Sequence, residues 1–70
     1  MMAKYLGVSV DGEGLDRQAE AGDTINEVEG CYHLEGYSVE DEIQIYDTAT
    51  GQAVSYYDWQ SNAWSRIGAS

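Results

Sequence analysis

Negative charge is the feature that most constrains this chain, because thirteen Asp and Glu residues stand against only three Lys and Arg. The net charge of -10 makes the compact state repel itself, which costs stability. It also excludes ordinary binding to nucleic acid or to an anionic membrane, since both attract positive surfaces. We therefore expect a partner protein with a basic surface. Simple solubility is the alternative explanation of the charge.

The length of 70 residues limits the domain organisation. A chain this short buries only about 60% of the surface that its unfolded form exposes, so residues 1–70 are expected to form a single domain. Cys31 is the only cysteine, so an internal disulfide is excluded and a reducing compartment is favoured. No apolar run is long enough for a signal peptide or a membrane span. We expect a soluble, cytoplasmic protein.

Alternating residues predict a strand near the beginning of the chain. From Lys4 to Val10 apolar side chains occupy every second position, which is the period of a strand with one buried face. Asp11 to Gly14 ends this strand, because its glycines allow positive φ and its acids do not pack. Leu15 to Ala21 remains open between a short helix and an edge strand. One side of the first strand carries Leu6, Val8 and Val10, and the other carries Tyr5, Gly7 and Ser9.

A capping box predicts the beginning of a helix. Thr24 stands three residues before Glu27, and each side chain is expected to bond the other's free backbone N–H. The helix is predicted from Ile25 to His33, and Gly30 in its middle makes it depend on packing. Its apolar stripe consists of Ile25, Val28, Cys31 and Tyr32.

The second half of the chain predicts a meander of three strands. From residue 39 the period changes to two, and Ile43 and Ile45 share one face of a strand. A hairpin turn at Asp47–Gly51 follows, with return strands at 52–57 and 63–67. The predicted fold is α+β: a four-stranded antiparallel sheet with one helix packed on a face, in the order strand, loop, helix, three-stranded meander.

The chain has few residues that are suited to catalysis. The only His and the only Cys are His33 and Cys31, and residues two apart on a helix point in different directions. A Cys–His nucleophile pair or a structural zinc site is therefore disfavoured. Carboxylates are abundant, but nothing selects two of them for acid–base chemistry. We expect no enzymatic activity, no cofactor and no metal.

One local motif resembles the opening of a LysM domain. Ala21-Gly22-Asp23-Thr24-Ile25, followed by Val28 and Tyr32, is similar to that family's Gly-Asp-Thr-Leu pattern, and Ser38–Asp41 is similar to the beginning of its second helix. The resemblance covers about a third of the chain. It implies a carbohydrate-binding module that recognises polymers of N-acetylglucosamine.

The acidic residues are spread over the whole chain, so folding is expected to place carboxylates over one or more faces. A structured negative surface imitates the phosphates of a duplex and associates quickly and salt-sensitively with a nucleic-acid-binding protein. In size, acidity and fold type the chain resembles the small phage-encoded inhibitors of host defence, such as anti-CRISPR proteins. That resemblance implies an inhibitor that binds a nucleic-acid-processing complex and blocks nucleic-acid binding. A virion assembly protein whose sheet pairs edge to edge is a further alternative.

Carboxylates and aromatic rings are the candidate contact residues. Tyr56 and Tyr57 are adjacent on a strand, so at least one of them is expected to be exposed as an interface anchor. The carboxylates would supply attraction and mimicry of phosphates. The predicted partner-binding residues are Glu27, Glu29, Glu40, Asp41, Glu42, Tyr56 and Trp59.

Overall fold

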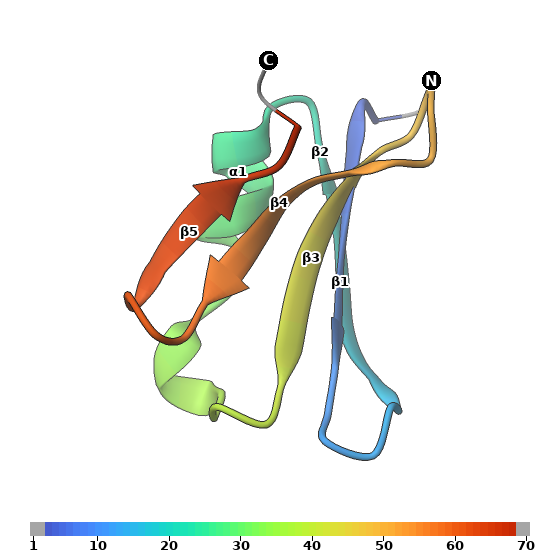
Figure 1. The fold of residues 1–70 in the computed structure, drawn as a ribbon. Helices are drawn as coiled ribbons and strands as arrows, with labels where there is room; N and C mark the ends of the chain where they lie inside the picture. Colours follow the sequence, from blue (N-terminus) through green and yellow to red (C-terminus); the bar gives the residue numbers. More distant parts are fainter. Residues whose placement is uncertain (1–2, 69–70) are drawn as a thin grey trace.

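Five antiparallel strands form one sheet in this computed structural model, which describes residues 3–68 (Figure 1). The strands lie in the order β2-β1-β3-β4-β5. A short helix and a 3-10 turn stand between β2 and β3. The elements are β1 Tyr5–Val10, β2 Asp16–Gly22, α1 Ile25–Gly30, η1 Leu34–Gly36, β3 Glu42–Asp47, β4 Ala53–Asp58 and β5 Ala63–Arg66.

The α+β class, the antiparallel sheet and the C-terminal meander are confirmed, but the number of strands is wrong. The stretch that the sequence left open is the edge strand β2, which pairs with β1 along its length. It carries no large apolar side chain, and its exposed positions are Asp16, Arg17, Ala19 and Ala21. Backbone pairing with β1 therefore determines its structure, and that signal is absent from the side-chain pattern.

The predicted helix is too long, and it does not form a layer on the sheet by itself. Half of the predicted capping box is confirmed, since the Thr24 side chain accepts from the N–H of Glu27 at 3.1 Å, whereas the Glu27 carboxylate accepts from the Thr24 hydroxyl at 3.3 Å and not from its backbone N–H. The helix nevertheless ends at Gly30, and Val28 is its only fully buried residue within the described chain. The remaining cover comes from irregular backbone and the η1 turn, through Tyr32, Leu34 and Tyr37.

The α1–η1 segment makes the crossover that the topology requires. β2 and β3 both run antiparallel to β1, so they are parallel to each other and a tight hairpin cannot join them. The crossing segment lies close to β1, where Gly7 faces it. A Cβ atom on Gly7 would lie 2.6 Å from Val28 Cγ1 and 2.8 Å from the Tyr32 hydroxyl. Glycine at this position is what allows the helix to approach the sheet.

The strand predicted at residues 4–10 is confirmed, and its buried side is the one that carries Gly7 and Ser9. Paired residues of an antiparallel sheet point to the same side. Leu6, Val8 and Val10 therefore lie on the opposite side, which we call the open face, and Leu6 is 38% exposed there. The core lies on the covered side and consists of Val28, Tyr32, Ile43 and Ile45, with Tyr57 and Trp64 packed against it.

Three hairpin loops each begin with an aspartate that stabilises its own turn. Asp11 accepts from the backbone N–H groups of residues 13 and 15, Asp47 from residue 49 and Asp58 from residue 60, at 2.8 to 3.0 Å. Gly51 takes a left-handed conformation, with φ of 75°, in the hairpin turn predicted at Asp47–Gly51. These three carboxylates thus have local structural roles.

Candidate functional site

Arg17 is held by the protein's own groups. Its Nη1 donates to the carboxylate of Asp41 at 2.8 Å, its Nη2 donates to the carbonyl of Gly36 at 3.3 Å, and its guanidinium carbon lies 4.3 Å from the centre of the Tyr37 ring. A β-bulge in β2 between residues 16 and 18 brings this arginine and Gln18 to the covered side. The Asp41 carboxylate, which also accepts from the N–H of Ser38, is therefore engaged inside the fold.

Arg66 is paired in the same way at the other end of the covered side. Its Nη1 donates to Glu29, whose carboxylate also accepts from the Ser55 hydroxyl at 2.9 Å, and its Nη2 donates to Asn26 at 3.1 Å. The Glu29 side chain is only 12% exposed. Both arginines of the chain therefore neutralise carboxylates of the chain itself, and Lys4, directly before β1, is the remaining cationic side chain.

The exposed carboxylates have little compensation from cations. Asp16 of β2 and Glu42 of β3 are both in register with Val10 of β1, so they flank it on the open face. Glu40 lies beside the loop between β1 and β2, since a Cβ atom on Gly12 would be 3.1 Å from its Oε2. We call Glu13, Asp16, Glu40 and Glu42 together the acidic end. The exposed carboxylates are Glu13, Asp16, Asp23, Glu27, Glu35, Glu40 and Glu42.

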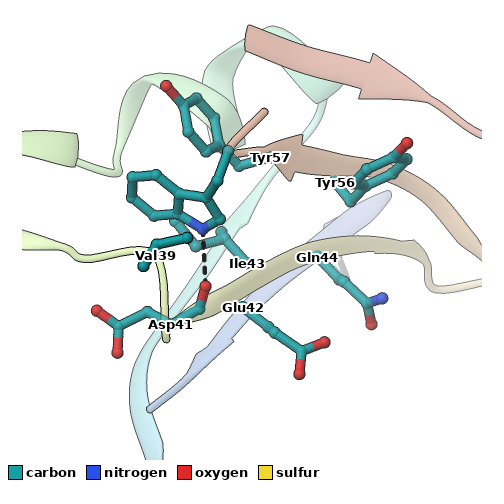
Figure 2. A pocket seen from close by; sticks show the side chains of 8 residues that line it. Val39, Asp41, Glu42, Ile43, Gln44, Tyr56 and Tyr57 are labelled. Atoms are coloured by element: carbon teal, nitrogen blue, oxygen red, sulfur yellow. Dashed lines mark hydrogen bonds between the residues drawn. The ribbon is translucent and has the colours of Figure 1, made fainter. Parts of the chain in front are cut away.

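Four of the seven predicted contact residues lie around one pocket of about 100 Å³ between β3 and β4 (Figure 2). Glu27, Glu29 and Glu40 lie elsewhere: Glu27 is in the helix cap and Glu29 in the Arg66 pair. The four residues at the pocket are Asp41, Glu42, Tyr56 and Trp59, and Val39, Ile43, Gln44 and Tyr57 complete the lining.

The pocket forms where two neighbouring strands diverge, as Figure 1 shows for β3 and β4. Register pairs between them run from Tyr46–Ala53 to Gln44–Tyr56, and the strands separate beyond the last pair. The indole Nε1 of Trp59 spans the gap and donates to the backbone carbonyl of Asp41 at 2.8 Å, drawn as a dashed line in Figure 2. Tyr57 holds the indole edge to face at 4.7 Å between ring centres. The pocket therefore has an aromatic wall of fixed orientation.

Two parts of this surface were missed from the sequence. Val39 is 73% exposed at the pocket. The only indication of this in the sequence is that Val39 is an apolar residue close to acidic ones. The open face was missed because the alternation in β1 does not reveal which of its two sides is buried. Register places Ala19 and Ala21 beside β1 on this face and Tyr46 and Tyr56 on its other flank. The open face thus continues into the pocket through Tyr56.

Cys31 and His33, which the sequence offered as a nucleophile pair, have different surroundings. Burial, with smaller contributions from Glu20 and Glu27, raises the pKa of the Cys31 thiol, which therefore stays protonated at neutral pH. His33 is exposed and precedes η1. Within residues 3–68 no three His, Cys, Asp or Glu side chains gather in an arrangement that could hold a metal ion. No helix in this part of the chain has the length and apolarity needed to cross a membrane.

Comparisons with protein-family models, curated proteins and solved structures find no match to this chain. The segment that resembles the second helix of a LysM domain, residues 38–41, forms a turn into β3. In this turn the N–H of Asp41 donates to the carbonyl of Ser38 at 2.9 Å.

Proposed function

We propose that this protein is a small acidic inhibitor, derived from a phage, that binds a basic surface of a nucleic-acid-processing complex and blocks nucleic-acid binding. A CRISPR effector is the kind of complex that fits this description. The observation that carries the proposal is the distribution of charge. Seven carboxylates are exposed, while both arginines are paired with carboxylates of the covered side.

The acidic end supplies the attraction in this proposal. Glu13 lies in the β1–β2 connection, Asp16 begins β2, Glu40 lies just before β3 and Glu42 begins it, and these segments lie at one end of the sheet (Figure 1). Like charges held on a rigid sheet act on a partner as a fixed array, as the phosphates of a duplex do, and they accelerate association with a basic groove. Such an array competes directly with nucleic acid for the groove.

The adjoining apolar surface would supply the short-range part of the contact. Tyr56 and Trp59 are half-buried at the pocket, and Val39 is largely exposed beside them. Aromatic side chains at the centre of an interface, surrounded by polar groups, are typical of the residues that dominate binding energy. Charge would then determine the rate and the partner, and the rings would prolong the complex.

Phage protection is the direct test. The protein is produced in bacteria whose CRISPR system targets a test phage, and plaque formation is counted. We expect plaques to be restored with the wild-type chain and reduced with the double variant E40Q/E42Q, while D23N/E35Q, which removes the same charge elsewhere, retains the activity. Unchanged plaque counts with the wild-type chain across the CRISPR types would contradict the CRISPR effector as target.

A binding measurement tests the wider class of partner. Immobilised wild-type protein is exposed to the bacterial lysate, and we expect a nucleic-acid-binding protein to be retained at about 50 mM salt and released at about 200 mM salt or by duplex DNA. Retention that is indifferent to both salt and DNA would contradict binding through a basic nucleic-acid site. The E40Q/E42Q variant is measured in the same way, with D23N/E35Q as its charge-matched control.

A further inference from the structure

The pocket between β3 and β4 brings together three kinds of surface that an arginine side chain uses. Tyr56 and Trp59 supply aromatic rings, Glu42 supplies a carboxylate, and Val39 and Ile43 supply apolar surface for a methylene stem. A guanidinium is planar, stacks on rings and forms charge-assisted hydrogen bonds with carboxylates. Aromatic rings, a carboxylate and apolar surface together favour a cation that has an apolar stem.

Glu42 is the carboxylate that remains available at this pocket. The Asp41 carboxylate accepts from Arg17 and Ser38, and its backbone carbonyl accepts from Trp59. Glu42 is exposed, and within residues 3–68 it makes neither a hydrogen bond through its side chain nor an ion pair. A cation entering the pocket therefore meets one carboxylate without displacing an internal bond.

The fold already contains an arginine held by this combination of groups. The guanidinium of Arg17 lies over the Tyr37 ring at 4.3 Å and bonds the Asp41 carboxylate at 2.8 Å. The pocket presents the same two elements, a ring and the carboxylate of the next residue along the chain, to the outside. The Arg17 arrangement is an example, on this same sheet, of a guanidinium held by a ring and a carboxylate.

We infer that the pocket receives a single arginine side chain of the partner protein, with its guanidinium against Tyr56 and Trp59 and bonded to Glu42. The expectation that the partner has a basic surface rests on the proposed function. The volume of about 100 Å³ suits the end of one side chain, whereas pockets for small-molecule ligands measure about 300–1,000 Å³. Lysine fits less well, because its ammonium is a compact, strongly hydrated charge that does not stack.

The test uses N-acetyl-arginine amide as the probe and nitrogen-15 NMR of the full chain as the readout. We expect saturable shifts of the Trp59 indole N–H and of the amides of Glu42 and Gln44, with a dissociation constant roughly in the millimolar range. E42Q is expected to weaken binding about two- to fivefold, the size of one partly exposed charge contact. D23N removes the same charge away from the pocket and should leave the affinity unchanged.

Two further arms keep the inference falsifiable. Y56L keeps an apolar wall and removes the ring, so it is expected to weaken the arginine probe more than N-acetyl-lysine amide. Shifts that spread over all exposed carboxylates without saturation, or equal effects of E42Q and D23N, would overturn the arginine site. If a partner still binds in a salt-sensitive way and E42Q and D23N weaken its binding equally, the proposed function stands without this pocket. If the pocket binds the arginine probe saturably but no basic partner is found, the arginine site stands without the proposed function.

Discussion

The indole N–H of Trp59 donates to the backbone carbonyl of Asp41 across 2.8 Å, and so joins the loop after β4 to the residue before β3 where the two strands have separated. The side chain of Asp41 meanwhile binds Arg17 from the covered side. One residue thus connects the candidate pocket to the packing of β2 and η1. Changes to either bond are expected to affect both stability and the pocket.

Trp59→Phe tests the indole bond. The substitution keeps an aromatic ring but removes the donor, leaving the Asp41 carbonyl without its partner inside the fold. We expect a loss of about 1 kcal/mol in the free energy of unfolding, measured by urea denaturation. Y56F, which changes a ring of the same pocket without touching this bond, should unfold at the wild-type urea midpoint. Equal midpoints for all three proteins would show that the bond does not contribute.

The ion pair between Arg17 and Asp41 is tested by a double-mutant cycle. Arg17→Met keeps the stem and removes the charge, which leaves the Asp41 carboxylate, on a side chain that is 8% exposed, with fewer donors. We expect R17M to destabilise by about 1 kcal/mol, and to cost much less when D41N is already present. Additive effects in urea denaturation would mean that the two side chains are not coupled.

Gly7→Ala tests the close approach of the helix to β1. The added Cβ would meet Val28 and Tyr32 at less than 3 Å, so the crossover must shift, at a cost of about 1–3 kcal/mol. Gly30→Ala is the matched control, since nothing lies within 4 Å of its Cβ position. That change should stabilise the helix by about 0.5–1 kcal/mol. Thermal unfolding of the two variants should therefore move in opposite directions.

Alkaline pH should destabilise the fold through Tyr32. Burial, with smaller contributions from Tyr37, Glu20 and Cys31, raises the pKa of this phenol above the value near 10 of a free tyrosine. The unfolded chain then loses the proton first, so the stabilising effect is complete below about pH 10 and is lost as the pH rises further. Urea midpoints from about pH 8 to 11 should fall less steeply for Y32F than for wild type. Identical slopes would contradict this assignment.

Short-range patterns predicted the parts of the fold that depend on them. The alternation around Ile43 and Ile45 predicted β3, and the aspartates at the hairpins predicted the turns, because each signal acts within a few residues. β2 was not predicted, since its only requirement is a paired backbone beside β1. The covered side of β1 was not evident either, because a crossover over Gly7 decides it and the alternation is the same for both sides.

The candidate site divides in the same way. Because adjacent residues on a strand cannot both point inward, Tyr56 or Tyr57 was predicted to be exposed; both are half-buried, and Tyr56 and Trp59 line the pocket. The engagement of Glu29 could not be foreseen, since its partner Arg66 lies 37 residues away and meets it only across the fold. The composition gives the number of carboxylates. It does not show which of them are paired inside the fold, because such pairs join residues that are far apart in the sequence.

The glycine beneath the crossover also has a use in tracing the ancestry of this chain. The packing of the fold does not depend on exposed carboxylates, whereas a side chain at position 7 would collide with Val28 and Tyr32. Gly22, on the neighbouring strand, meets Val28 from the other side, with 3.1 Å from its Cβ position to Cγ2. Distant relatives are therefore expected to keep these two glycines and a small apolar residue at position 28 after their acidic residues have diverged. That three-position signature is a more durable marker of descent than the charge.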